Sequence, residues 1–159
     1  MTPFSTTKSS DTAVIRRMGR FATFTGSLLL AGGGAAWCAV TKQLRDENIT
    51  VPGNAPALAG RRVQDPATAY VEAIVIKRNA ERSAGGRTFA DISDAMREVE
   101  KGSDEEKQLR GQSAALSTAA SLRTSLMTAV LAYGVSALVI GLGGFLAVVG
   151  SQFRRAGSR

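Results

Sequence analysis

The stretch TSLMTAVLAYGVSALVIGLGGFLAVVGSQF, residues 124–153, decides the fold because it runs for about thirty residues without a formal charge. At about 1.5 Å per residue, a helix of this length exceeds the roughly 30 Å hydrocarbon core of a bilayer. We therefore interpret residues 124–153 as a transmembrane helix. A second uncharged run, FATFTGSLLLAGGGAAWCAV at residues 21–40, predicts another transmembrane helix, with aromatic residues near both of its ends.

Composition limits the chemistry that the chain can perform. The 159 residues include one Cys and no His, and 44% of them are hydrophobic, an ordinary share that is concentrated in the two runs. Without His there is no imidazole base near neutral pH and no His-containing zinc or iron site. A single Cys allows no intrachain disulfide. We expect no enzyme activity, no catalytic or metal-binding residue and no cofactor.

The first run has a competing interpretation as a cleaved signal peptide, because Arg16, Arg17 and Arg20 precede an apolar stretch. The run is long for the apolar core of a signal peptide, and Trp37 interrupts any lipobox before Cys38. We favour a retained helix, while cleavage stays open.

Basic residues predict the topology. Residues 1–20 form a Ser/Thr-rich tail with four Lys or Arg, which we expect to be disordered, and residues 154–159 form a second tail with three Arg. Residues 41–123 carry thirteen Lys or Arg against twelve acids. The positive-inside rule then places both termini in the cytoplasm and residues 41–123 outside the membrane. The residues assigned to topology and to lipid headgroups are Arg16, Arg17, Arg20, Arg154 and Arg155.

The first half of the outer segment predicts one helix after a linker. Residues 41–48 prolong the first transmembrane helix, and prolines break it before a linker that ends at Gly60. Asp65 and Pro66 are a start signal for a helix that Gly85 and Gly86 terminate. A strand over residues 70–76 is the alternative. The expected apolar stripe of the helix consists of Ala67, Tyr70, Val71, Ile74 and Arg78.

The second half predicts a short helix and then a long one. Thr88 with Asp91 resembles a capping pair for a helix carrying Phe89, Ile92, Met96 and Val99. Ser103 with Glu106 forms a second capping box, and no strong breaker follows before the membrane. We expect one continuous helix from about Asp104 through the second span, with Glu106 paired to Arg110. The acidic run at residues 104–106 is better explained by the helix dipole than by a cation site.

Small residues recur in both spans at a spacing of four, which permits close packing of helix backbones. They join the two spans to each other, or they contact a second copy or another membrane protein. These helix-packing residues are Ser27, Ala31, Ala35, Ala137, Gly141, Gly143 and Ala147.

Other motifs add little. The triplet Gly32 to Gly34 lacks the Lys-Ser/Thr of a phosphate loop. The spans contain no ionisable residue of the kind that marks ion-coupled transporters. Cys38 is interpreted as a small buried hydrophobic residue rather than a lipidation site.

Four short motifs resemble a family of small actinobacterial membrane proteins: LRDENITVP at 44–52, TAY at 68–70, GRTFA at 86–90 and SLRTSL at 121–126. The resemblance implies two membrane spans and a central segment, over about residues 14 to 153. Members often carry the label of an aromatic ring-opening dioxygenase, which implies an iron site built with histidines. This chain has no His, so the resemblance supplies no catalytic residue.

The sequence thus predicts an all-α fold, a two-transmembrane-helix hairpin with an extended helical stalk and a small outward-facing helical cap. The expected function is non-catalytic, as an accessory or assembly subunit or an envelope scaffold in the cell membrane that acts through helix–helix contacts. The alternative is a small oligomeric pore. The expected partners are membrane lipids and another membrane protein or a second copy, with no nucleic acid.

Overall fold

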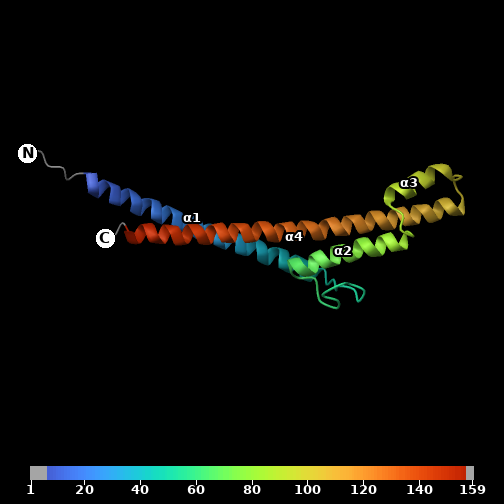
Figure 1. Cartoon of the computed structure of the whole chain (residues 1–159), viewed down its shortest axis with the longest axis horizontal. Coiled ribbons are helices and arrows are strands. Elements are labelled where there is room, and N and C mark those ends of the chain that lie inside the picture. The colour runs from blue at the N-terminus through green and yellow to red at the C-terminus, as the bar shows by residue number, and fades with distance from the viewer. Residues whose placement is uncertain (1–6, 157–159) are drawn as a thin grey trace, which may run out of the picture. The chain divides into compact units, whose positions relative to one another are not determined.

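The computed structural model describes residues 7–156, with side chains from residue 13 onward. Its helices are α1 (Thr7–Asp46), α2 (Pro66–Ser83), α3 (Phe89–Glu98) and α4 (Asp104–Ala156), and the described residues form no strand (Figure 1). The prediction of an all-α fold with two long apolar helices is confirmed. The chain divides into two compact units. The paired-helix unit joins the chain up to Ala39 to the chain from Ala132 onward, and the central unit is Val40–Leu131.

Helix α1 is longer at its start than the predicted span. The expectation of a disordered tail over residues 1–20 is wrong for residues 7–20, which belong to α1, while residues 1–6 lie outside the described part. Residues 13–18, AVIRRM, contain Ala, Arg and Met, which favour helix, and no Pro or Gly interrupts the run from residue 7 to residue 18. At its other end α1 continues to Asp46, as predicted.

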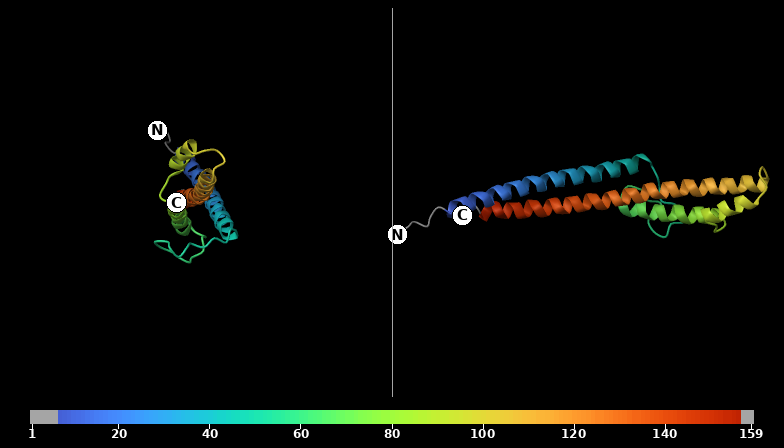
Figure 2. Two further views of the ribbon diagram at one scale, coloured as in Figure 1. Left: turned by 90° about the vertical axis from the view of Figure 1, so that its right-hand side faces the viewer. Right: turned by 90° about the horizontal axis from the view of Figure 1, so that it is seen from above.

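In the paired-helix unit, α1 and the C-terminal part of α4 lie side by side and antiparallel (Figures 1 and 2). The start of α1 and the end of α4 consequently lie at the same end of the pair. Arg154 and Arg155 belong to the last turn of α4 rather than to a separate tail.

Helix α2 begins where the sequence predicted. The Asp65 carboxylate accepts the backbone N–H groups of Ala67 and Thr68 at 3.0 and 2.9 Å, and the Thr68 hydroxyl oxygen accepts the Asp65 N–H in return. The helix ends before Gly85 and Gly86, both at positive φ, as expected of a glycine terminator. The strand alternative is therefore excluded.

The buried face of α2 differs from the predicted stripe. Tyr70 is 49% exposed, and Ala67 and Arg78 are also exposed. The predicted stripe followed the larger apolar side chains, whereas the helix is buried along a face with two alanines, which let a neighbouring helix approach. The residues on this buried face are Thr68, Ala69, Glu72, Ala73 and Val75.

Helix α3 closes a small hydrophobic cluster. Thr88 and Asp91 form the predicted capping box. Fully buried Ile92 packs with Ala84 and with Leu109 of α4, and Met96 and Val99 add partly buried contacts. Phe89, by contrast, is 54% exposed, because it is the first residue of α3 and precedes the turn that carries Ile92.

The segment between α1 and α2 is ordered rather than a simple linker. Thr50 and Arg62 form an isolated antiparallel bridge, and Val51 N–H donates to the Arg61 carbonyl at 2.9 Å. Val51 and Val63 are both buried. The loop is therefore closed on itself by backbone hydrogen bonds and by two buried valines.

Candidate functional site

The two helices of the paired-helix unit meet along glycines spaced seven residues apart. On α1 these glycines are Gly19, Gly26 and Gly33. Each is nearly two helical turns from the next, so all three lie on one side of the helix. They face Gly150, Gly143 and Ser136 of α4, which have the same spacing in the opposite direction. The antiparallel register is therefore set by pairs of small residues at three successive levels.

These glycines bring the two backbones into direct contact. A Cβ atom added to Gly26 would lie 2.6 Å from the Gly143 carbonyl oxygen and 2.6 Å from the Ala147 nitrogen. A Cβ on Gly150 would lie 2.6 Å from the Thr23 nitrogen. Real Cβ atoms do not approach so closely, so these positions require glycine. Close packing of this kind drives association where lipid offers no hydrophobic advantage.

An aromatic contact continues the pairing beyond Gly33. The rings of Trp37 and Tyr133 meet edge to face with centroids 4.6 Å apart, and Tyr133 is buried. Such pairs contribute about 0.5–1.5 kcal/mol beyond burial of their area. Trp37 therefore packs within the chain, in addition to its expected place near a membrane interface.

Hydroxyl groups near the contact are bonded within their own helices. Thr23, Ser27 and Ser136 each donate to the carbonyl oxygen four residues earlier, at 2.8 to 3.0 Å. These three hydroxyl groups therefore donate within their own helices rather than across the contact.

Only part of the predicted packing set lies in this contact. Gly143 and Ala147 are among the residues that face α1. Ser27, Ala31, Ala35, Ala137 and Gly141 are exposed, so the prediction that these five join the two spans to each other is wrong. Ala35 is nine residues after Gly26 and so about 180° around the helix. The alternative, contact with a second protein, stays a prediction.

The outward faces of both helices are strongly apolar. Phe21 and Phe24 of α1 are 73% and 70% exposed, and Leu138 and Phe145 of α4 are 72% and 64% exposed. Cys38 is also exposed, which corrects the expectation that it is buried. Two helices of the described chain, α1 from Ala13 and α4, are long and apolar enough to cross a membrane.

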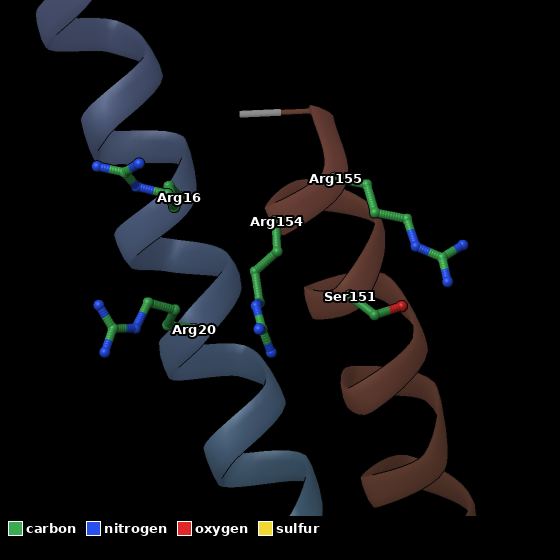
Figure 3. A pocket seen from close by; sticks show the side chains of 5 residues that line it. All are labelled: Arg16, Arg20, Ser151, Arg154 and Arg155. Atoms are coloured by element: carbon green, nitrogen blue, oxygen red, sulfur yellow. The ribbon is translucent and has the colours of Figure 1, made fainter. Parts of the chain in front are cut away.

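Basic side chains gather at the end of the pair where α1 begins and α4 ends. A hollow of about 700 Å³ is lined by Arg16 and Arg20 of α1 and by Ser151, Arg154 and Arg155 of α4 (Figure 3). The structure thus brings together four of the five arginines assigned to topology and headgroups. Arg17 is exposed and does not line the hollow. In the view of Figure 3, Arg154 extends into the space between the two helices, whereas Arg16 and Arg20 extend away from α4 and Arg155 extends away from α1.

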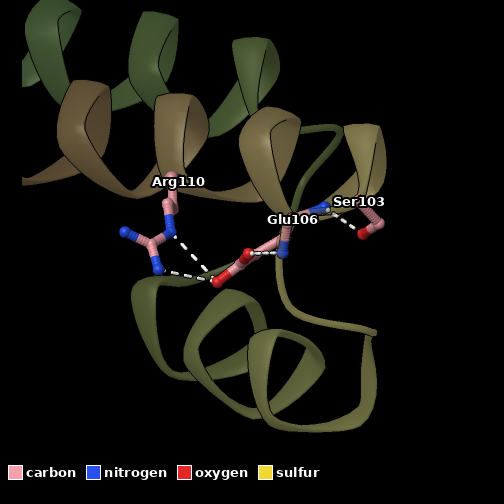
Figure 4. A network of polar contacts seen from close by, with 4 residues as sticks. Ser103, Glu106 and Arg110 are labelled. Atoms are coloured by element: carbon pink, nitrogen blue, oxygen red, sulfur yellow. Dashed lines mark hydrogen bonds and ion pairs between the residues drawn. The ribbon is translucent and has the colours of Figure 1, made fainter.

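The acidic start of α4 is used for capping. Glu106 N–H donates to Ser103 Oγ at 3.1 Å, and the Glu106 carboxylate accepts the Gly102 N–H at 2.6 Å and Arg110 Nη2 at 2.7 Å (Figure 4). The predicted Glu106–Arg110 pair is confirmed. The capping box is displaced by one residue, because the carboxylate reaches Gly102 rather than Ser103.

One acidic side chain of the central unit is buried without a partner. Glu72 is 5% exposed, and its Oε2 atom has no hydrogen bond. Burial raises the pKa of Glu72 above its ordinary value of 4.5, since desolvation disfavours the charged form. No group of three potential metal ligands is found within the described residues.

Comparison with known proteins gives no relative for this chain: no family model, curated protein or solved structure matches it. The resemblance to small actinobacterial membrane proteins consequently stays a prediction.

Proposed function

We propose that the chain is a two-span membrane protein of the cell membrane, with both termini in the cytoplasm, and that it serves as a non-catalytic accessory or assembly subunit. In this proposal α1 and the apolar part of α4 form the membrane hairpin. The central unit stands on the extracytoplasmic side.

The observation that carries the proposal is that each of the two paired helices has small residues on two opposite sides. One face is used within the chain, where Gly26 and Gly143 meet. The outward sides are exposed: on α4 a Cβ on Gly141 would meet no atom within 4 Å and Ala137 is exposed, and on α1, at the opposite side of the pair, Ala31 and Ala35 are exposed. We call Gly141 and Ala137 of α4 the outer small-residue face, and a helix of another membrane protein can pack there against small residues.

The first test is purification from native membranes in a mild detergent, with mass spectrometry of the proteins that accompany the chain. A larger stoichiometric complex supports the accessory role. Recovery of a homo-oligomer that passes ions or solutes through liposomes would replace this proposal with the pore function.

The second test uses paired variants. Gly141→Leu fills the outer small-residue face and is expected to lower partner recovery while leaving the Trp37–Tyr133 contact unchanged. Leu142→Phe enlarges a residue that is already large, about 100° away around α4, and is expected to leave recovery unchanged. Equal recovery with both variants would contradict the assignment of the outer face to a partner.

A further inference from the structure

The arginine hollow at the end of the helix pair is built by the same contact that joins the helices. Gly19 lies between Arg16 and Arg20 on α1, and it packs directly against Gly150 and Arg154 of α4. Arginines that are far apart in the sequence thereby line one hollow. Its formation depends on close approach of the two backbones.

The helices that form this end carry an excess of positive charge. Sequence counting gives the paired-helix unit seven Lys or Arg and one acid, Asp11, which precedes the residues with described side chains. No acidic residue occurs in the two paired segments from Ala13 to Ala39 and from Ala132 to Ala156. Of the +7 formal charge of the chain, this unit carries +6. Within residues 13–156, Arg16, Arg20 and Arg154 enter no ion pair.

We infer that this hollow is a binding site for the phosphate of an anionic phospholipid headgroup. Guanidinium groups bind phosphate oxygens through paired, charge-assisted hydrogen bonds. Arg20 and Arg154 are adjacent in sequence to Phe21 and Phe153, which bound the uncharged runs at this end. In the proposed membrane placement, a phosphate in the hollow is therefore at the depth of lipid headgroups. Basic pockets between membrane helices on the cytoplasmic side favour anionic lipids for these reasons. The four arginines give this end a local excess of positive charge, which favours a headgroup with negative charge.

This inference rests on the membrane placement proposed above, so the two are tested separately. Resistance of the full chain to extraction by alkaline carbonate shows whether the chain is inserted in the membrane. Lipid binding is measured on detergent-solubilised full-length protein by native mass spectrometry, with cardiolipin, phosphatidylglycerol or phosphatidylcholine added in mixed micelles. Binding measured in this way does not require prior insertion.

Two variants with equal loss of charge distinguish a site from general attraction. The first carries Arg16→Gln, Arg20→Gln and Arg154→Gln in the hollow. The second carries Arg61→Gln, Arg62→Gln and Lys101→Gln, at exposed positions of the central unit. We expect the first variant to lose affinity for anionic lipid by about tenfold or more, since each basic residue near a membrane surface contributes on the order of 1 kcal/mol. We expect the second to bind as the unaltered chain does.

Equal loss in both variants would overturn the inference, because net charge alone would explain the binding. Equal binding of phosphatidylcholine and cardiolipin would also overturn it. Inorganic phosphate is added as a competitor, to distinguish a lipid headgroup from free phosphate as the ligand of the hollow. Complete displacement of the lipid by millimolar phosphate would assign the hollow to free phosphate and refute the lipid, whereas retention of the lipid supports it.

Discussion

The glycine contact between α1 and α4 makes a quantitative prediction for Gly26→Ala. The added Cβ would lie 2.6 Å from backbone atoms at Gly143 and Ala147, while ordinary contact begins at 3.4 Å. The helices must therefore separate by about 0.8 Å at this level. A gap of about 0.5–1 Å already forfeits a quarter to a half of the dispersion attraction of the atoms that lined the contact.

A matched control removes the effect of helix propensity. Gly32→Ala makes the same chemical change on α1, and its Cβ meets no atom within 4 Å. In both variants the higher helix propensity of Ala raises the stability of α1 by about 1 kcal/mol. Only Gly26→Ala incurs the overpacking cost, about 1–3 kcal/mol, so its hairpin should be less stable than that of the control by this amount. Gly33→Ala should fall between them, because its nearest neighbour, Ile140 Cγ1 at 2.8 Å, is a side-chain atom that can move.

The assay is reversible unfolding in mixtures of a mild detergent and dodecyl sulfate. The chain has one tryptophan, Trp37, whose contact with Tyr133 makes its fluorescence a reporter of helix pairing. The expected order of stability is Gly32→Ala, then Gly33→Ala, then Gly26→Ala. Equal stability of Gly26→Ala and Gly32→Ala would refute the close backbone contact at Gly26.

Three further changes test the central unit by thermal unfolding followed with circular dichroism. Because burial raises the pKa of Glu72, the folded chain holds this proton more tightly than the unfolded chain, and stability falls as pH rises from about 4.5 through the raised pKa. Glu72→Gln should therefore be more stable than the unaltered chain at pH 8 and lose part of the pH dependence; an unchanged profile would contradict this. Asp65→Ala removes the cap of α2 and should cost about 1 kcal/mol, a cost that Asp65→Asn should largely avoid. Ile92→Ala empties the centre of a cluster and should cost about 2–5 kcal/mol, whereas exposed Phe89→Ala should cost far less, and similar losses would count against the cluster.

Helix boundaries could be predicted from the sequence because their signals are local. The Asp65–Pro66 pair starts α2, and Thr88 with Asp91 starts α3, since the capping groups are adjacent to the backbone that they satisfy. The long α4 followed from the lack of any breaker after Ser103. The prediction of a disordered N-terminal tail was wrong from residue 7 onward. The Ser, Thr and basic residues near the terminus are typical of disordered tails, but the helix propensity of the following residues extends α1 to Thr7.

The contact faces were harder to predict because small residues occur on several sides of both spans. The spacing of four in Ser27, Ala31 and Ala35 indicated one face, while α1 is paired through glycines spaced by seven. The sequence does contain that signal, since Gly19, Gly26 and Gly33 match Ser136, Gly143 and Gly150 in reverse order. The arginine hollow required knowledge of the antiparallel register, which residue spacing within a single helix does not supply.

The most direct test of the proposed two-span membrane hairpin is accessibility labelling of single cysteines in intact cells. With Cys38→Ala as background, one cysteine is placed at Ala13, at Ser83 or at Ala156, and a membrane-impermeant maleimide is added before or after permeabilisation. The account predicts that Ser83→Cys reacts from outside, and that Ala13→Cys and Ala156→Cys react only after permeabilisation. Reaction of the two terminal positions from opposite sides of the membrane would contradict this topology. Removal of residue 13 by cleavage of the first helix would contradict it as well.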